Sequence, residues 1–154
     1  MAYEIEHKYL VNSSEYKQMA VSRHEIKQGY LSDNPESVVR VRVVDETGYF
    51  TVKGKTFSHE TSKGKCDVRK EFEYTIPKEE AEEMLSLCKK GYISKTRYKI
   101  PYDGFIWEVD EFHRQHKGLI LAEIELKSPD IIYPLPPFIG EEVTGDPKYY
   151  NSNL

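Results

Sequence analysis

Like-charged side chains recur two residues apart in several short segments of this sequence. Glu4 and Glu6 form one such pair, and Arg40 and Arg42 form another. Residues i and i+2 of an extended strand point to the same face, so each pair places two like charges side by side. Carboxylates suit Mg2+ or Mn2+, whereas Arg and Lys suit phosphate oxygens. Both kinds on one surface predict a site for a metal–polyphosphate complex.

The alternation of charged with β-branched or aromatic residues is typical of half-buried strands, and we expect about eight of them, including a short one near residues 28–31. The acidic members of the pattern are Glu4, Glu6, Glu71, Glu73, Glu108, Asp110, Glu123 and Glu125. The basic members are Lys8, Arg40, Arg42, Lys53, Arg69, Lys95 and Arg97. Helices are predicted at residues 13–23, 77–90 and 147–154. Residues 54–67 and 130–137 are predicted to be loops.

Two arrangements of these strands are compatible with the pattern alone. An open antiparallel sheet would leave its charged face in water, as such sheets commonly do. A closed barrel would instead carry helices on its apolar outer face and turn the charged residues into a central tunnel. A charged interior of this kind is costly unless it binds charged species.

Length and composition narrow the classes of protein. The 154 residues predict a single domain spanning positions 1–154. The 22 basic and 26 acidic side chains lack the basic excess of a duplex-binding protein, so no nucleic-acid partner is expected. No apolar run approaches the roughly 20 residues that span a bilayer, so no membrane partner is expected. Cys66 and Cys88 form no CxxC pair, which favours a reduced, cytoplasmic protein.

Taken in order, the charged segments resemble the CYTH superfamily, the triphosphate tunnel metalloenzymes. Glu4-Ile-Glu6-His-Lys8 matches the family's ExExK motif at the extreme N-terminus. The later motifs follow in family order: VRVR, TVKG, RKEFEYTIP, SKTRY, WEVDEF, LAEIEL and EEVTGDPKYYN. The resemblance runs from about Tyr3 to Leu154 and favours the barrel over the open sheet.

The resemblance implies an α+β fold, a closed antiparallel β-barrel tunnel of about eight strands with helices packed outside. It implies an enzyme similar to short bacterial inorganic triphosphatases, which would use Mg2+ or Mn2+ to hydrolyse inorganic triphosphate to pyrophosphate and phosphate. The implied metal ligands are Glu4, Glu6 and Glu125. The implied phosphate-binding residues are Lys8, Arg40, Arg42, Lys53, Arg69, Lys95 and Arg97. Glu71, Glu73, Glu108, Asp110 and Glu123 are the candidates for a second metal or for orienting water.

The same pattern of charged residues is compatible with other functions. Relatives of the family include adenylate cyclases and thiamine triphosphatases, so a nucleotide or another organic triphosphate is an alternative substrate. A non-catalytic polyphosphate or nucleotide sensor is a third alternative. The family analogy also allows a homodimer. Where relatives often have Arg-Tyr-Ser-Asn near the C-terminus, this chain has Lys148-Tyr149-Tyr150-Asn151, a segment that can cover one tunnel mouth.

Overall fold

The computed structural model describes residues 3–61 and 64–154 of the chain. Its strands are β1 (Tyr3–Val11), β2 (Ser22–Ser32), β3 (Ser37–Val44), β4 (Thr47–Gly54), β5 (Phe57–Thr61), β6 (Gly64–Ile76), β7 (Tyr92–Tyr102), β8 (Phe105–Phe112), β9 (Ile120–Glu125) and β10 (Ile139–Glu142). Its helices are α1 (Tyr16–Met19), α2 (Lys78–Ser86) and three 3-10 turns at Arg114–His116, Pro147–Tyr149 and Asn151–Asn153.

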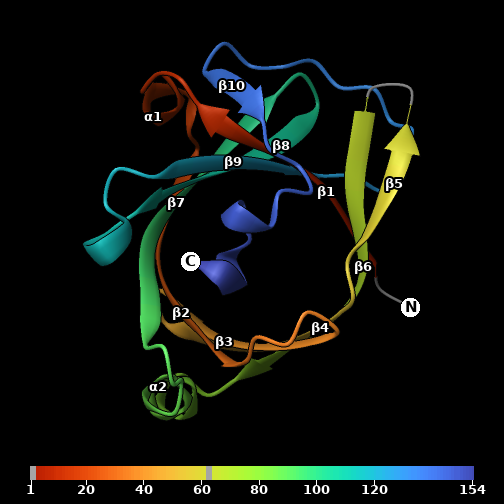
Figure 1. Cartoon of the computed structure of the whole chain (residues 1–154). Helices are drawn as coiled ribbons and strands as arrows, with labels where there is room; N and C mark the ends of the chain where they lie inside the picture. The colour runs from red at the N-terminus through yellow and green to blue at the C-terminus, as the bar shows by residue number, and fades with distance from the viewer. Residues whose placement is uncertain (1–2, 62–63) are drawn as a thin grey trace.

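The strands form one antiparallel sheet that closes on itself (Figure 1). Along the sheet the order is β10-β1-β9-β8-β7-β2-β3-β4-β6-β5, and a further pairing between β1 and β6 completes the ring. Within the described residues, β10 pairs only with β1 and β5 only with β6, so the ring itself has eight strands. The predicted closed barrel is therefore confirmed.

Period-two alternation sends one set of side chains outward, where they form two apolar clusters. The larger cluster lies over β1, β7, β8 and β9, and Trp107 and Ile100 are fully buried in it. It is covered by α1, through Tyr16, and by the irregular segment after β9, through Tyr133 and Phe138. This segment includes residues 130–137, so the predicted absence of regular structure there is confirmed.

The smaller cluster lies beneath α2, on the opposite side of the barrel (Figure 1). Ala81 and Leu85 of the helix pack on Val41 and Val43 of β3. Pro77 precedes the helix, as its fixed φ favours, but α2 ends at Ser86 rather than at residue 90. Both α-helices thus lie outside the barrel, as the sequence predicts.

Three local predictions are wrong. The expected helix at 13–23 is reduced to α1, because residues from Ser22 onward pair with β7 as part of β2. Of the residues predicted to be helical, Tyr16 is buried in α1, but Arg23 lies opposite Tyr98 on a strand. The expected loop at 54–67 contains β5 and the start of β6, although residues 62 and 63 lie outside the described part. The expected C-terminal helix consists of two 3-10 turns.

Gly48 on β4 marks the closest approach of α2 to the barrel. A Cβ atom there would lie 2.8 Å from the Ala81 Cβ and 2.8 Å from the Ile76 carbonyl oxygen. We expect Gly48→Ala to lower the free energy of unfolding by about 1–3 kcal/mol, because the helix must shift away. Urea denaturation measures this change. Gly54→Ala is the control, since its Cβ would meet nothing closer than 3.7 Å; an equal loss in both variants would contradict the packing argument.

Candidate active site

The inward face of the barrel forms a charged cavity. Thirteen of the fifteen residues singled out in the sequence line it: Glu4, Glu6, Lys8, Arg40, Arg42, Lys53, Arg69, Glu71, Glu73, Arg97, Glu108, Glu123 and Glu125. Strand register brings them together, because Glu6 lies opposite Glu125 on β9 and Lys8 lies opposite Glu123. The remaining two, Lys95 and Asp110, are buried but do not line the cavity.

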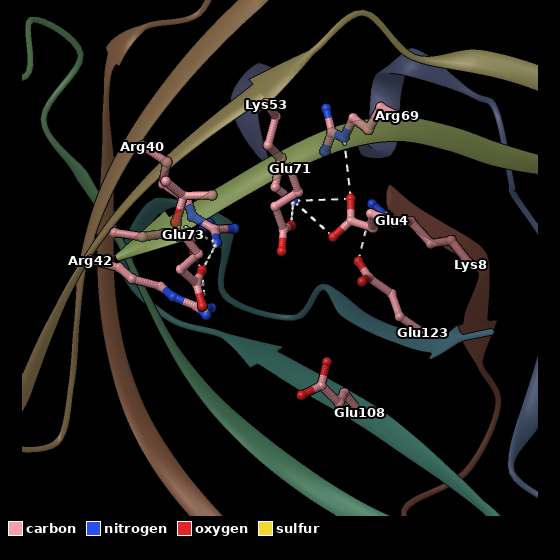
Figure 2. Close-up of polar contacts among 12 residues, drawn as sticks. Glu4, Lys8, Arg40, Arg42, Lys53, Arg69, Glu71, Glu73, Glu108 and Glu123 are labelled. Carbon is pink, nitrogen blue, oxygen red and sulfur yellow. Dashed lines mark hydrogen bonds and ion pairs between the residues drawn. The ribbon is translucent and has the colours of Figure 1, made fainter. Parts of the chain in front are cut away.

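One group of charges centres on Glu4 and is contributed by β1, β4 and β6 (Figure 2). The Lys53 ammonium donates to both carboxylate oxygens of Glu4 at 3.0 Å, and Arg69 Nε donates to one of them at 3.2 Å. Lys53 Nζ also lies 3.3 Å from a Glu71 oxygen. Burial would raise the pKa of Glu4, but Lys53 and Arg69 outweigh it and hold that pKa well below its usual range. Glu4 is therefore ionised.

A second group converges on one oxygen of Glu73 from the neighbouring strands (Figure 2). Arg40 Nη2 donates to it at 3.2 Å, Arg42 Nη2 at 3.3 Å and the Thr51 hydroxyl at 2.8 Å. Burial, together with Arg40 and Arg97, lowers the pKa of Arg42 to about 10. Within the described part of the chain, the Nε donors of both arginines are buried without a hydrogen-bond partner. Each guanidinium thus keeps a donor in reserve, which a bound anion can use.

The third group lies deeper in the wall and centres on Asp110. Arg97 grips this carboxylate with two donors, Nε at 2.8 Å and Nη2 at 2.9 Å, and Lys95 Nζ lies 2.7 Å from it. Lys95 is fully buried, and burial lowers its pKa to about 8. The Arg97 guanidinium also reaches Glu108 at 3.5 Å. Asp110 and Lys95 therefore support Arg97 from behind, while Arg97 and Glu108 face the cavity.

Lys8 connects two parts of the cavity wall. Its ammonium lies 3.2 Å from a Glu123 oxygen on β9 and donates to the Tyr149 carbonyl at 3.0 Å. Burial would lower the pKa of Lys8, but Glu123 and Glu6 outweigh it and raise that pKa. Lys8 is therefore a charged donor near the C-terminal segment.

Carboxylates dominate the charged surroundings of Glu6 and Glu125. Burial, then Glu123 and Glu4, raise the pKa of Glu6 well above its usual range. Burial, then Glu4, Glu71 and Glu108, raise the pKa of Glu125 to about 7. A hard divalent cation would relieve this crowding, and the oxygen donors fit Mg2+ or Mn2+. In the described part of the chain, no three acidic, histidine or cysteine side chains are already gathered tightly enough to hold a metal ion.

The structure adds cavity residues that the sequence reasoning missed. They are Tyr30, Val38, Thr56, Asp67 and Ser152, whereas Tyr150 and Asn151, which also line the cavity, belong to the segment expected at one tunnel mouth. Asp67 has the same strand parity as Arg69 and lies opposite Glu6, but it falls in the segment that was predicted to be a loop. Tyr30 lies opposite Arg40, so its parity on β2 could have identified it. Tyr150, Asn151 and Ser152 have no strand periodicity, so only the family resemblance connected the first two with the tunnel, and Ser152 is recognised only in three dimensions.

The CYTH domain model matches residues 2–150, and the chain therefore belongs to the CYTH domain family. It is 47% identical over 155 residues to the inorganic triphosphatase of Acetivibrio thermocellus, covering all of this chain and 94% of that protein. It is 32% identical to the inorganic triphosphatase of Nitrosomonas europaea, covering 98% of this chain and 95% of the relative.

Solved structures show the same barrel. The crystal structure of an inorganic triphosphatase superposes with a TM-score of 0.65 at 28% identity, covering 99% of this chain and 94% of that one. A putative adenylyl cyclase from Hippeastrum, described as having a dominant triphosphatase activity, gives a TM-score of 0.62 at 20% identity. The match covers 82% of this chain and 80% of that one, and at this identity it shows the fold alone.

No helix in the described residues is long and apolar enough to cross a bilayer.

The buried position of Asp110 predicts a structural effect of its removal. Asp110→Asn leaves Lys95 and Arg97 without their carboxylate, so we expect the free energy of unfolding to fall by about 3–5 kcal/mol, measured by denaturant titration. Glu73→Gln is the comparison, because Glu73 also pairs with two bases but its side chain is 29% exposed. Its loss of stability should be smaller. If Asp110→Asn unfolded like the wild type, the supporting role would be wrong.

Proposed function

We propose that this chain is a divalent-metal-dependent inorganic triphosphatase that hydrolyses triphosphate to pyrophosphate and phosphate inside the barrel. The observation that carries the proposal is the closed cavity in which Lys and Arg side chains face a surplus of carboxylates. Bases alone would suffice to bind a polyanion. Surplus acids at Glu6 and Glu125 make sense as ligands of a cation that enters with the substrate. The two relatives named inorganic triphosphatase support the same activity.

Phosphate binding is assigned to the cavity bases. Arg40 and Arg42 present adjacent guanidinium groups on β3, each with an unused buried Nε donor. Lys53 and Arg69 present two more cations from β4 and β6 near Glu4. Lys8 and Arg97 complete the set from β1 and β7, and the Asp110–Lys95 pair holds Arg97 in place. Phosphate oxygens would replace part of the present carboxylate contacts, since Arg binds both groups with the same planar donors.

Metal binding is assigned to Glu4, Glu6 and Glu125, which lie on the adjacent strands β1 and β9. A bound Mg2+ or Mn2+ would neutralise charge on the phosphate oxygens and lower the pKa of coordinated water. Glu71, Glu108 and Glu123 line the same cavity and would orient the attacking water or bind a second cation. The water oxygen forms a bond to a terminal phosphorus, and the bond from that phosphorus to the bridging oxygen breaks. The cavity bases stabilise the departing pyrophosphate.

Glu6→Gln tests the metal assignment, because glutamine keeps the shape of the side chain and removes its charge. We expect the affinity for Mn2+, measured by calorimetry, to fall by about 100-fold or more, as for the loss of one metal ligand or its hydrogen-bond partner. The rate of triphosphate hydrolysis should fall by a similar factor. The fold should be retained, since burial already disfavours the Glu6 carboxylate. Glu141→Gln, an exposed position on β10, is the matched control. Unchanged Mn2+ affinity in Glu6→Gln would reject this ligand set.

A substrate panel tests the activity. Phosphate release from inorganic triphosphate, ATP and pyrophosphate is compared at equal concentrations of Mg2+ or Mn2+, and again with a chelator. We expect triphosphate to be the fastest and pyrophosphate to be poor, because three linked phosphates engage more of the cavity bases than two. Chelation should abolish release. Conversion of ATP to cyclic AMP faster than triphosphate hydrolysis would favour a cyclase, and binding without turnover would favour a sensor.

A further inference from the structure

The C-terminal segment, residues 146–154, lies inside the ring of strands (Figure 1). Tyr149 and Leu154 pack against an apolar cluster that includes Phe112 and Leu121. These two cluster residues share the inward parity of Asp110 and Glu123 on β8 and β9. The charged face of these strands thus gives way to apolar side chains, and the C-terminal segment fills that part of the barrel.

Several hydrogen bonds hold this segment in place. The Lys8 ammonium donates to the Tyr149 carbonyl at 3.0 Å, and the Val143 amide just before the segment donates to the Lys8 carbonyl at 2.8 Å. Within the segment, the Asn153 side-chain amide donates to the Pro147 carbonyl at 2.8 Å. The segment is therefore a fixed part of the cavity wall that is anchored to the same β1 residue that faces Glu123.

Tyr150, Asn151 and Ser152 form the part of this wall that faces the charged cavity. The side-chain Oδ1 of Asn151 is buried and has no hydrogen-bond partner among the residues that the structure describes. An unpaired buried polar atom costs free energy, so it marks a position where a ligand can complete the bonding. The oxygen and nitrogen of an amide exchange places by rotation of the side chain, so this position can equally present an N–H donor. A donor in a cavity that Lys8 also lines suits a phosphate oxygen.

We propose that Asn151 is a specificity-determining residue that binds the innermost phosphate of the substrate, at the closed end of the cavity. This inference rests on the proposed triphosphatase function and narrows its substrate class. Because Tyr150, Asn151 and Ser152 line this end of the cavity and the C-terminal segment packs on the apolar cluster beyond them, the substrate must lead with an unsubstituted terminal phosphate. Linear phosphate chains with at least one free end fit this requirement. Cyclic phosphates and chains substituted at both ends do not.

The other end of a substrate has room to project. Glu108 and Glu125 line both the cavity and a second groove, which is also lined by Tyr3, Ile5 and Phe105. A chain that carries an organic group at one end can leave that group in this groove while its free phosphate reaches Asn151. The geometry therefore separates singly substituted from doubly substituted triphosphates, which carry the same number of phosphorus atoms.

Two matched pairs of compounds test whether the substrate needs an unsubstituted terminal phosphate. ATP is compared with P1,P3-di(adenosine-5′) triphosphate, which bears adenosine at both ends, and linear tripolyphosphate is compared with cyclic trimetaphosphate. We expect the doubly substituted and cyclic compounds to show kcat/KM values lower by about 100-fold or more, because steric exclusion is a strong form of discrimination. Comparable values within either pair would overturn the requirement for a free end.

Variants test the residue itself. Asn151→Ala should raise KM for tripolyphosphate by about tenfold, which corresponds to one lost hydrogen bond to a charged group. Asn151→Asp has the same shape but repels phosphate, so its loss should be larger than that of the alanine variant. Asn34→Ala is the control, because it removes the same side chain at an exposed position between β2 and β3 that does not line the cavity. If Asn34→Ala matched Asn151→Ala, or if Asn151→Asp bound tripolyphosphate like the wild type, the assignment would fail.

Calorimetric binding of tripolyphosphate separates this inference from the proposed function. Absence of turnover in the wild-type protein with every metal would reject the triphosphatase proposal. The Asn151 assignment would still be judged by binding: weaker binding in Asn151→Asp than in Asn151→Ala supports it, and equal binding in both variants rejects it.

Discussion

The pairing of β1 with β6 is the contact on which the charged cavity depends. Tyr3 to Glu6 lie opposite Lys70 to Asp67, and this short ladder closes a sheet that would otherwise be open. An open sheet would expose the Glu4 and Arg69 side chains to water, where their attraction is weak. Closure places them in a confined space in which each charge must be balanced by a neighbour or by a ligand. The same ladder places Asp67 opposite Glu6, so it also assembles part of the carboxylate surplus.

Within the ring, the charges fall into balanced and unbalanced sets. Glu4, Glu73 and Asp110 each accept from two basic side chains, which keeps the bases ordered before any substrate arrives. Glu6 and Glu125 instead lie near other carboxylates, and burial, followed by repulsion from those carboxylates, raises their pKa values. A cavity of this kind is prepared for a ligand that brings both negative and positive charge. A metal–polyphosphate complex has that composition, whereas a simple anion or a free cation would satisfy only one set.

Packing on the apolar outer face of the barrel offsets part of the free-energy cost of the charged interior. Two clusters, one beneath α2 and one beneath α1 and the segment after β9, remove large side chains such as Trp107 from water. Burial of such side chains contributes roughly 1.5–3 kcal/mol each, which offsets part of the cost of the buried charges. The inner end near Phe112 and Leu121 is apolar as well, and there the C-terminal segment completes the wall. Outer packing thus maintains the barrel, while the inner surface serves binding.

The sequence by itself determined which residues face inward, because strand parity is a local property that the i, i+2 spacing reports. Glu4, Arg40 and most of the other predicted residues line the cavity for this reason. It also determined the family, since the charged motifs keep their order along the chain.

Tertiary structure alone decided which charges meet. Asp110 lies behind Arg97, although its i, i+2 spacing from Glu108 is that of the other charged pairs. Tertiary structure also decided that residues 22 and 23, which were predicted to end a helix, begin a strand, because pairing with β7 outweighs local propensity. The position of Asn151 in the cavity wall depends on packing between distant parts of the chain, and no periodic signal in the sequence encodes such contacts.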